Sequence, residues 1–246
     1  MILGESVILV AGGAGDIGSY ISSDLAKNGA NVFVADRCKE KLSELSPSLK
    51  TIYMDAAEPE SVQQMVDQVI AQAGRIDVLI NCAGRIYSEP LINISNYPKL
   101  QHDYSKFAEI VASNLHTAFI LGAAVAEQMV KLRTKGLILN FSSISAQGNA
   151  GQTAYAAAKA GVEAMTKVWA KELGTLGIRS VAIAPGFIET PSTHNALNEK
   201  LVKHIIQGTP LRRLGSLEEI GIAVLHAIEN DFLNGTTVEI NGGLTL

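Results

Sequence analysis

Residues 7–18 read VILVAGGAGDIG, five apolar residues followed directly by a glycine-rich turn. The run Val7–Ala11 is typical of a buried strand, and the stretch Ile17–Lys27 has the apolar spacing of an amphipathic helix. Asn28 and Gly29 then supply a helix stop. The stretch therefore predicts a strand, a tight glycine turn and a helix, in that order.

The same alternation continues along the chain. Further strands are predicted at 31–35, 49–54, 76–80, 137–141, 179–183 and 238–240, and further helices at 59–72, 107–132 and 154–176. The strand runs are continuously apolar, as burial on both faces of a parallel sheet requires. We therefore expect an α/β fold with a doubly wound parallel sheet of the Rossmann type, forming a single domain over residues 1–246.

Composition excludes several classes of protein. With 47% hydrophobic and 18% charged residues, the chain is not globally disordered. A net charge of −4 gives no basic footprint for nucleic acid or an anionic membrane. Cys38 and Cys82 cannot form a disulfide framework, the five histidines show no metal-ligand spacing, and the N-terminus lacks a signal-peptide pattern. We expect a cytoplasmic protein without metal, membrane or nucleic-acid partner.

Two segments interrupt the alternation, near residues 85–106 and 187–209, and each follows the end of a predicted strand. Ligands of doubly wound sheets bind outside the carboxyl ends of the strands. We expect both segments to be substrate loops beside that site, rather than ordinary surface loops.

The glycine turn also predicts a ligand. Gly13-Ala14-Gly15-Asp16-Ile17-Gly18 reads G-x-G-x-x-G between a strand and a helix. Glycines let the backbone approach a pyrophosphate, and the helix N-terminus offers free N–H groups and the positive end of its dipole. We expect cofactor-binding residues at Gly12, Gly15, Asp16, Ile17 and Gly18.

Asp36 closes the second predicted strand at about the distance, roughly 20 residues, expected of a ribose-binding acid. A carboxylate there accepts hydrogen bonds from ribose hydroxyls and repels a 2′-phosphate. NAD(H) is therefore the preferred cofactor, while the adjacent Arg37, also placed in the cofactor site, leaves NADP(H) open.

Tyr155 and Lys159 lie four residues apart and share one face of a predicted helix. A phenol with a pKa of about 10 is a poor acid or base at neutral pH, and a nearby ammonium moves that pKa toward the working range. Ser142 and Ser143 end the preceding strand, which brings hydroxyls to the same end of the sheet.

These motifs occur in a familiar order: the glycine turn, Asn81-Cys82-Ala83-Gly84, Asn114, the serine pair, Tyr155 with Lys159, residues 185–190 (PGFIET) and residues 241–243 (NGG). In this combination the whole chain resembles the short-chain dehydrogenases/reductases. Residues 148–161 (GNAGQTAYAAAKAG) are especially similar to the 3-oxoacyl-ACP reductase branch.

The resemblance implies a catalytic set of Asn114, Ser143, Tyr155 and Lys159. Tyr155 would be the general acid/base, and Lys159 would lower its pKa and hold the nicotinamide ribose. Ser143 would bind the substrate oxygen, and Asn114 would anchor a water of the proton relay. The strand LNFSS indicates Ser143, whereas the usual spacing before the tyrosine indicates Ser142, so the choice between them is open.

The resemblance also implies the remaining cofactor contacts. Asp55 and Ala56 would border the adenine, Ile188 and Thr190 would contact the carboxamide, and the other contacts would come from Asn81, Ala83, Gly84, Pro185 and Gly186 together with Tyr155 and Lys159.

The sequence departs from the family's usual turn, T-G-x-x-x-G-x-G, at two positions: Ala11 replaces the threonine and Asp16 replaces the middle glycine. A carboxylate beside a pyrophosphate is unfavourable unless it points away or caps the helix, so we expect Asp16 to influence cofactor affinity. Leu176 stands where acyl-carrier reductases typically have a basic residue, which argues against docking of acyl carrier protein.

The expected function is an NAD(P)(H)-dependent oxidoreductase that interconverts a secondary alcohol and a ketone, with a 3-oxoacyl thioester as one candidate substrate. The resemblance implies a homotetramer, with the helices at 107–132 and 154–176 as candidate interfaces. The alternative is a catalytically inactive nucleotide-binding regulatory protein on the same fold, which Asp16 favours and the complete catalytic set opposes. An epimerase or dehydratase would need a larger substrate domain than the residues after Ile188 provide.

Overall fold

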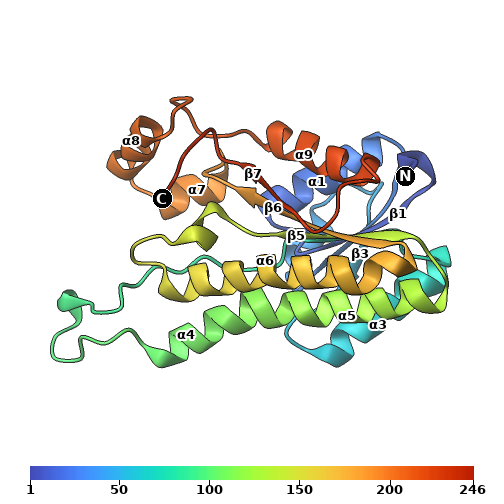
Figure 1. Cartoon of the computed structure of the whole chain (residues 1–246), viewed down its shortest axis with the longest axis horizontal. Coiled ribbons are helices and arrows are strands. Elements are labelled where there is room, and N and C mark those ends of the chain that lie inside the picture. Colours follow the sequence, from blue (N-terminus) through green and yellow to red (C-terminus); the bar gives the residue numbers. More distant parts are fainter.

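The computed structural model describes residues 1–246 and contains one seven-stranded parallel sheet in the order β3-β2-β1-β4-β5-β6-β7 (Figure 1). The strands are β1 (Val7–Ala11), β2 (Asn31–Asp36), β3 (Lys50–Tyr53), β4 (Val78–Asn81), β5 (Gly136–Phe141), β6 (Ile178–Pro185) and β7 (Thr237–Ile240). The predicted doubly wound sheet is confirmed. The strand order reverses between β1 and β4, and their carboxyl ends, Ala11 and Asn81, pair in register.

Helices cover both faces of the sheet (Figure 1). One face carries α1 (Asp16–Lys27) and α9 (Leu217–Glu229), whose Ile21, Leu25 and Val224 join a buried cluster with Ile8 and Val10 of β1. The other face carries α3 (Pro59–Ala73), α5 (Thr117–Lys131) and α6 (Thr153–Leu173). Alternate residues of each strand thus enter separate cores, which is why the strands read as continuous apolar runs.

The predicted helix at 107–132 is a continuous helical stretch in three parts. It consists of α4 (Tyr104–Val111), a π-helical turn (Ala112–His116) and α5. The stretch Tyr104–Lys131 is long and apolar enough to cross a membrane by length and composition, which is weak evidence for a span. Leu121, Val125 and Met129 of α5 belong to the second buried core cluster, which accounts for its apolar side.

The two irregular segments differ from each other. The segment at 187–209 contains two helices, α7 (Pro191–Ala196) and α8 (Glu199–Gly208), which the sequence reading did not anticipate because their apolar periods are too short. A short α2 (Lys39–Ser43) and α9 were also not predicted.

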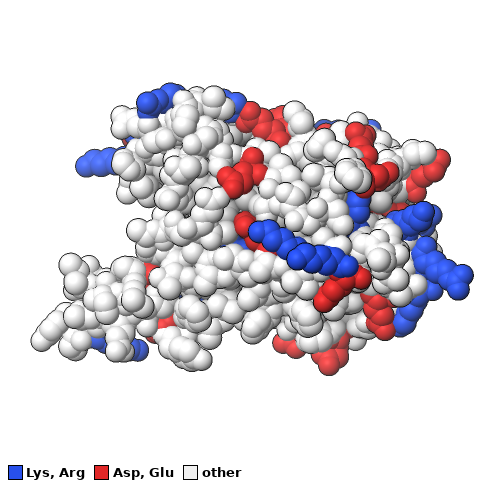
Figure 2. Space-filling model, in the orientation of Figure 1, with Lys and Arg blue, Asp and Glu red and all other residues white.

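The segment at 85–106 is mostly irregular and projects from the domain as an arm that carries few charges on the face shown in Figure 2. Buried Glu89 organises its base. The Glu89 carboxylate accepts hydrogen bonds from Tyr87 Oη (3.0 Å), Asn96 Nδ2 (3.4 Å) and the backbone N–H of Asp103 (3.1 Å). Hydrogen bonds to the Glu89 carboxylate therefore hold the arm together, although it contains little regular secondary structure.

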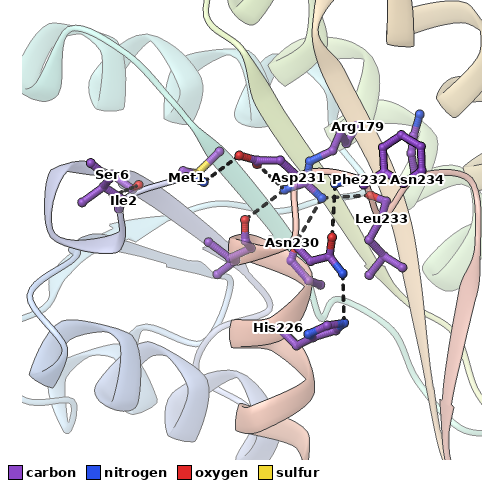
Figure 3. A network of polar contacts seen from close by, with 12 residues as sticks. Met1, Ile2, Ser6, Arg179, His226, Asn230, Asp231, Phe232, Leu233 and Asn234 are labelled. Atoms are coloured by element: carbon purple, nitrogen blue, oxygen red, sulfur yellow. Dashed lines mark hydrogen bonds and ion pairs between the residues drawn. The ribbon is translucent and has the colours of Figure 1, made fainter.

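Arg179 of β6 ties the sheet to the end of α9 (Figure 3). Its guanidinium donates to the carbonyl oxygens of Ala227 (2.9 Å), Ile228 (3.0 Å) and Leu233 (2.9 Å). It also lies 3.6 Å from the carboxylate of Asp231, which the N-terminal ammonium approaches to 3.1 Å. A cation at a helix C-terminus also complements the helix dipole.

Replacing Arg179 with methionine should lower the free energy of unfolding by about 2–4 kcal/mol, because three carbonyl groups lose a charged donor. Urea unfolding at one fixed protein concentration measures the change. Lys167→Met, at an exposed position of α6, is the matched control and should shift stability by less than about 0.5 kcal/mol. Equal shifts for the two variants would contradict the role of Arg179.

Candidate active site

The glycine turn closes directly on the turn after β4. Gly12 has a φ of +70°, and a Cβ at this position would lie 2.6 Å from the backbone nitrogen of Ala83. A Cβ at Gly18 would lie 2.6 Å from the Gly12 carbonyl oxygen. At Gly15, in contrast, the nearest protein atom would be 3.6 Å away. Protein packing therefore demands glycine at Gly12 and Gly18, while Gly15 is open toward the cavity that it lines.

This cavity has a volume of about 220 Å³ and runs along the carboxyl ends of β1, β2 and β4. Predicted cofactor residues that line it are Gly12, Gly15, Asp36, Arg37, Asp55, Ala56, Ala83 and Gly84. The sequence reading missed Met54, Ala57, Cys82, Arg85, Ser113 and Thr117, which also line it. These six lie beside motif residues in the sequence or on one turn of the α4–α5 stretch, but no residue-type signal singles them out.

The cavity fits a dinucleotide by the chemistry of its donors. Gly15 is the N-cap of α1 and has no side chain to occupy the first N–H groups of the helix. Those groups are open to a ligand, and the helix dipole favours an anion there. Ile17 and Gly18, which the sequence predicts to contact the cofactor, lie in this first turn.

Asp36 ends β2 with its carboxylate fixed on the backbone. Its Oδ2 accepts from the Ala14 N–H at 3.1 Å, and its Oδ1 accepts from the Cys38 N–H at 3.0 Å. Each oxygen retains a lone pair for a further donor. The glycine turn thus holds a negative charge at one end of the cavity.

Asp16 points away from the cavity wall formed by Gly12 and Gly15. Its Oδ2 accepts from the Ser192 N–H of α7 at 2.9 Å. Partial burial raises the pKa of Asp16, but hydrogen bonds from Ser192 and Thr190 outweigh this effect, so that the pKa lies below its usual value. The Asp16 carboxylate therefore does not point toward the predicted pyrophosphate position, which is the orientation that would be unfavourable.

A buried polar chain lies behind the cavity. Asn81 Oδ1 accepts from the Ala83 N–H at 3.2 Å, and Asn81 Nδ2 donates to Asn140 Oδ1 of β5 at 3.3 Å. Asn140 Nδ2 in turn contacts Thr166 Oγ1 of α6 at 3.2 Å. Asn81 therefore shapes the cavity through the backbone of Ala83, and it is not itself a lining residue.

Asn114 sits in the π-helical turn and is buried. Its Oδ1 accepts from the Arg85 N–H at 3.2 Å, while its Nδ2 donates to the carbonyl oxygens of Arg85 (3.0 Å) and Ile110 (2.9 Å). A Cβ at Gly84 would meet Asn114 Oδ1 at 2.4 Å and Lys159 Nζ at 3.4 Å. The turn after β4 thus brings Asn114 close to Lys159.

The two serines point to different partners. Ser142 Oγ donates to Glu163 Oε1 of α6 at 2.7 Å and lies 3.4 Å from the Lys159 carbonyl oxygen. Ser143 Oγ accepts from the Ser145 N–H at 3.2 Å, and its side chain lies close enough to the Tyr155 hydroxyl to lower the pKa of that group. Only Ser143 faces the tyrosine.

Burial dominates the electrostatics of Tyr155 and Lys159. It raises the pKa of Tyr155 to about 12, with a smaller opposing effect of the Ser143 hydrogen bond. It lowers the pKa of Lys159 to about 8. Lys159 Nζ donates to the Phe141 carbonyl oxygen at 2.8 Å and lies 5.7 Å from the centre of the Tyr155 ring. The expected lowering of the tyrosine pKa by Lys159 is thus not seen, because desolvation is the larger effect on both groups.

Cys82 packs against the core, as expected, and also lines the cavity. Burial raises the pKa of its thiol to about 12, so it is a neutral side chain.

The segment after β6 approaches the site from the other side. Pro185 ends β6, Ile188 is buried and pairs with Gly215, and buried Thr190 is the N-cap of α7. A Cβ at Gly186 would lie 2.9 Å from Asn241 Cα, so Gly186 allows close approach of the C-terminal segment. None of these four residues lines the cavity around Asp36.

Comparison with known proteins agrees with this geometry. The profile of the family described as enoyl-(acyl carrier protein) reductase matches residues 12–245. The chain is 36% identical over 256 residues to 3-oxoacyl-[acyl-carrier-protein] reductase FabG of Thermotoga maritima, covering 100% of both chains. It is 34% identical over 260 residues to a human (3R)-3-hydroxyacyl-CoA dehydrogenase, covering 98% of this chain and 96% of the relative.

Among solved structures, a short chain dehydrogenase from Bacillus anthracis superposes with a TM-score of 0.87 at 32% identity, covering 99% of this chain and 97% of the other. Shared fold, near-complete coverage and the clustered serine, tyrosine and lysine lead to one assignment. The chain belongs to the short-chain dehydrogenase/reductase family, resembles its 3-oxoacyl-ACP reductases, and is a nicotinamide-dependent oxidoreductase of the alcohol–ketone class.

Proposed function

We propose that this protein is an NAD(H)-preferring reductase of a 3-oxoacyl thioester. The observation that carries the catalytic part is the convergence of Ser143, Tyr155 and Lys159 at the ends of β5 and α6. Support for the substrate comes from the relatives, whose names place the reacting oxygen at carbon 3 of an acyl group.

In this proposal Tyr155 is the proton donor. A phenol with a pKa of about 12 is fully protonated at neutral pH, so it is ready to protonate an oxygen on which negative charge develops. Ser143, whose side chain lies beside the Tyr155 hydroxyl, orients the same carbonyl oxygen. The bound nicotinamide would supply the hydride to the carbonyl carbon.

The Lys159 ammonium supplies positive charge close to the Tyr155 ring. With a pKa of about 8 it is mostly protonated at pH 7, and its hydrogen bond to Phe141 fixes its position. We assign Lys159 to the nicotinamide ribose and to stabilisation of the tyrosinate formed after proton donation. We assign Asn114, which lies close to Lys159 across Gly84, to a water that returns a proton to this pair.

Asp36 supports the preference for NAD(H). Its carboxylate is fixed at one end of the cavity, which we assign to the adenosine, and there it would accept hydrogen bonds from two ribose hydroxyls and repel a 2′-phosphate. Arg37 lines the same cavity and keeps NADP(H) as an alternative cofactor. We assign Asp55 and Ala56 to the adenine, and Ile188 and Thr190 to the nicotinamide carboxamide.

We further propose a cytoplasmic homotetramer. Phe119 of α5 and Val168 of α6 are 56% and 48% exposed, which leaves apolar side chains on the helices expected to form interfaces. The segments at 85–106 and 187–209 are assigned to the substrate entrance. The alternative of an inactive nucleotide-binding protein has no support, because the catalytic residues are complete and the Asp16 carboxylate is engaged by α7.

Tyr155→Phe should retain cofactor binding and lower kcat by about 10²- to 10⁴-fold, because the proton donor is lost while the ring remains. Steady-state reduction of a 3-oxoacyl thioester measures the loss of turnover, and calorimetric titration with NADH measures the retained cofactor binding. Tyr53→Phe, at a half-exposed position of β3, is the control and should keep full activity. An active Tyr155→Phe enzyme would refute the mechanism.

The value of kcat/KM for ketone reduction should fall as the pH rises through about 8, because Lys159 then loses the charge that the reaction needs. Tyr155 stays protonated over this range and does not contribute to the decline. Rates between pH 6 and 10, roughly two units on either side, define the profile. Lys159→Arg keeps a cation throughout, so its residual activity should lack the decline; a wild-type profile that is flat to pH 10 contradicts the assignment.

Asp36→Ala should narrow the preference for NADH over NADPH by at least about tenfold, or about 1.4 kcal/mol, because the repulsion of the 2′-phosphate is removed. The dissociation constants of both cofactors measured by calorimetry give this ratio. Asp67→Ala, on the exposed side of α3, should leave it unchanged. An unchanged ratio in Asp36→Ala would show that Asp36 does not contact the ribose.

A further inference from the structure

Asp16 occupies the position of the family's middle glycine, and the proposed chemistry gives it no role. It is the first residue of α1, and its carboxylate accepts the Ser192 N–H at 2.9 Å. The two residues are far apart in the chain, so the contact joins the glycine turn to a separate segment. We call that segment, residues 187–208, the lid.

The lid is held at its two ends by different contacts. At the first end, the Glu189 N–H donates to the Gly215 carbonyl oxygen at 2.7 Å, and the Gly215 N–H donates to that of Phe187 at 2.9 Å. At the second end, Ile205 of α8 is buried in a small apolar cluster with Leu214 and Leu244. Between them, α7 buries no residue. Apolar packing therefore does not fix α7, and a polar contact is needed there.

Asp16 provides that contact, because its carboxylate binds the first turn of α7. Besides donating the Ser192 N–H, the start of α7 brings the side chains of Ser192 and Thr190 close enough to the Asp16 carboxylate to lower its pKa. Thr190 Oγ1 accepts the Thr193 N–H at 3.1 Å, and Thr193 Oγ1 donates to the Ile188 carbonyl oxygen at 2.7 Å. Asp16 thus holds the start of α7 through Ser192, and the hydrogen bonds of Thr193 connect this first turn to Thr190 and Ile188.

Charge favours the same arrangement. A carboxylate at a helix N-terminus interacts favourably with the free N–H groups and with the dipole. The lowered pKa of Asp16, which results from the Ser192 and Thr190 hydrogen bonds in spite of partial burial, keeps this carboxylate ionised at neutral pH.

We propose that Asp16 is a positioning residue that latches α7 to the glycine turn, so that the protein itself holds the lid closed before cofactor binds. The proposed function enters only through the assignment of Ile188 and Thr190 to the nicotinamide. With glycine at position 16 the carboxylate is absent, and α7 loses this contact with the glycine turn. Asp16 thus preorganises α7 before the cofactor binds.

Hydrogen exchange over residues 188–208, with and without NADH, tests the latch. In the wild type the α7 amides should be protected without NADH, and NADH should slow their exchange by less than about twofold. In Asp16→Ala their exchange without NADH should be about tenfold faster, as expected for loss of a hydrogen bond to a charged group. NADH should then restore most of the protection.

Two controls separate the latch from general destabilisation. Asp67→Ala removes an exposed carboxylate from α3 and should leave lid exchange unchanged. Asp16→Gly introduces the family's usual residue, so it should fold, and it should behave as Asp16→Ala does. Exchange in β5 peptides serves as the internal reference, and equal acceleration there and in α7 would overturn a role specific to the lid.

A different role for Asp16 predicts a different result. If its charge acted only by repelling the pyrophosphate, Asp16→Ala would bind NADH more tightly and leave α7 exchange unchanged, which would overturn the latch. The comparison of α7 amide exchange between the wild type and Asp16→Ala without NADH tests the latch independently of the cofactor. Failure of NADH to bind the wild type would instead refute the cofactor assignment and leave that comparison intact.

Discussion

The site depends on the close approach of two backbone turns at the point where the strand order reverses. Gly12 can stand against Ala83 only because it has no Cβ, and its positive φ turns the chain into α1 at once. This approach fixes the first turn of α1 relative to the segment after β4. The cavity, the helix N–H groups and the Asp36 carboxylate all take their positions from it.

Burial of polar groups is the second constraint, and its cost is offset by a specific partner at each position. Asn114 is held by the backbone of Arg85, Lys159 by the Phe141 carbonyl oxygen, and Ser142 by Glu163. These partners fix the geometry of the reacting groups, while desolvation sets their protonation states. The raised pKa of Tyr155 and the lowered pKa of Lys159 both result from burial of these side chains away from solvent.

Asp16 shows that neighbouring residues in the sequence can give the wrong prediction of a side chain's role. The glycine turn alone predicts that the Asp16 carboxylate weakens pyrophosphate binding by repulsion. In the folded chain the carboxylate faces the start of α7, where the Ser192 N–H donates a hydrogen bond to it. The serine pair makes the same point, because Ser142 donates to Glu163 of α6 whereas Ser143 lies beside Tyr155 near the start of the same helix.

The sequence by itself determined the doubly wound sheet, the glycine turn and the Tyr155–Lys159 pair, because these follow from periods and spacings within one or two elements. It did not determine the partners of Asp16, Ser142 or Glu89, the cavity residues Arg85 and Thr117, or the helices of the lid. Nor did it yield the pKa values of Tyr155 and Lys159. All of these depend on contacts between distant segments and on burial, which only the packed tertiary structure decides.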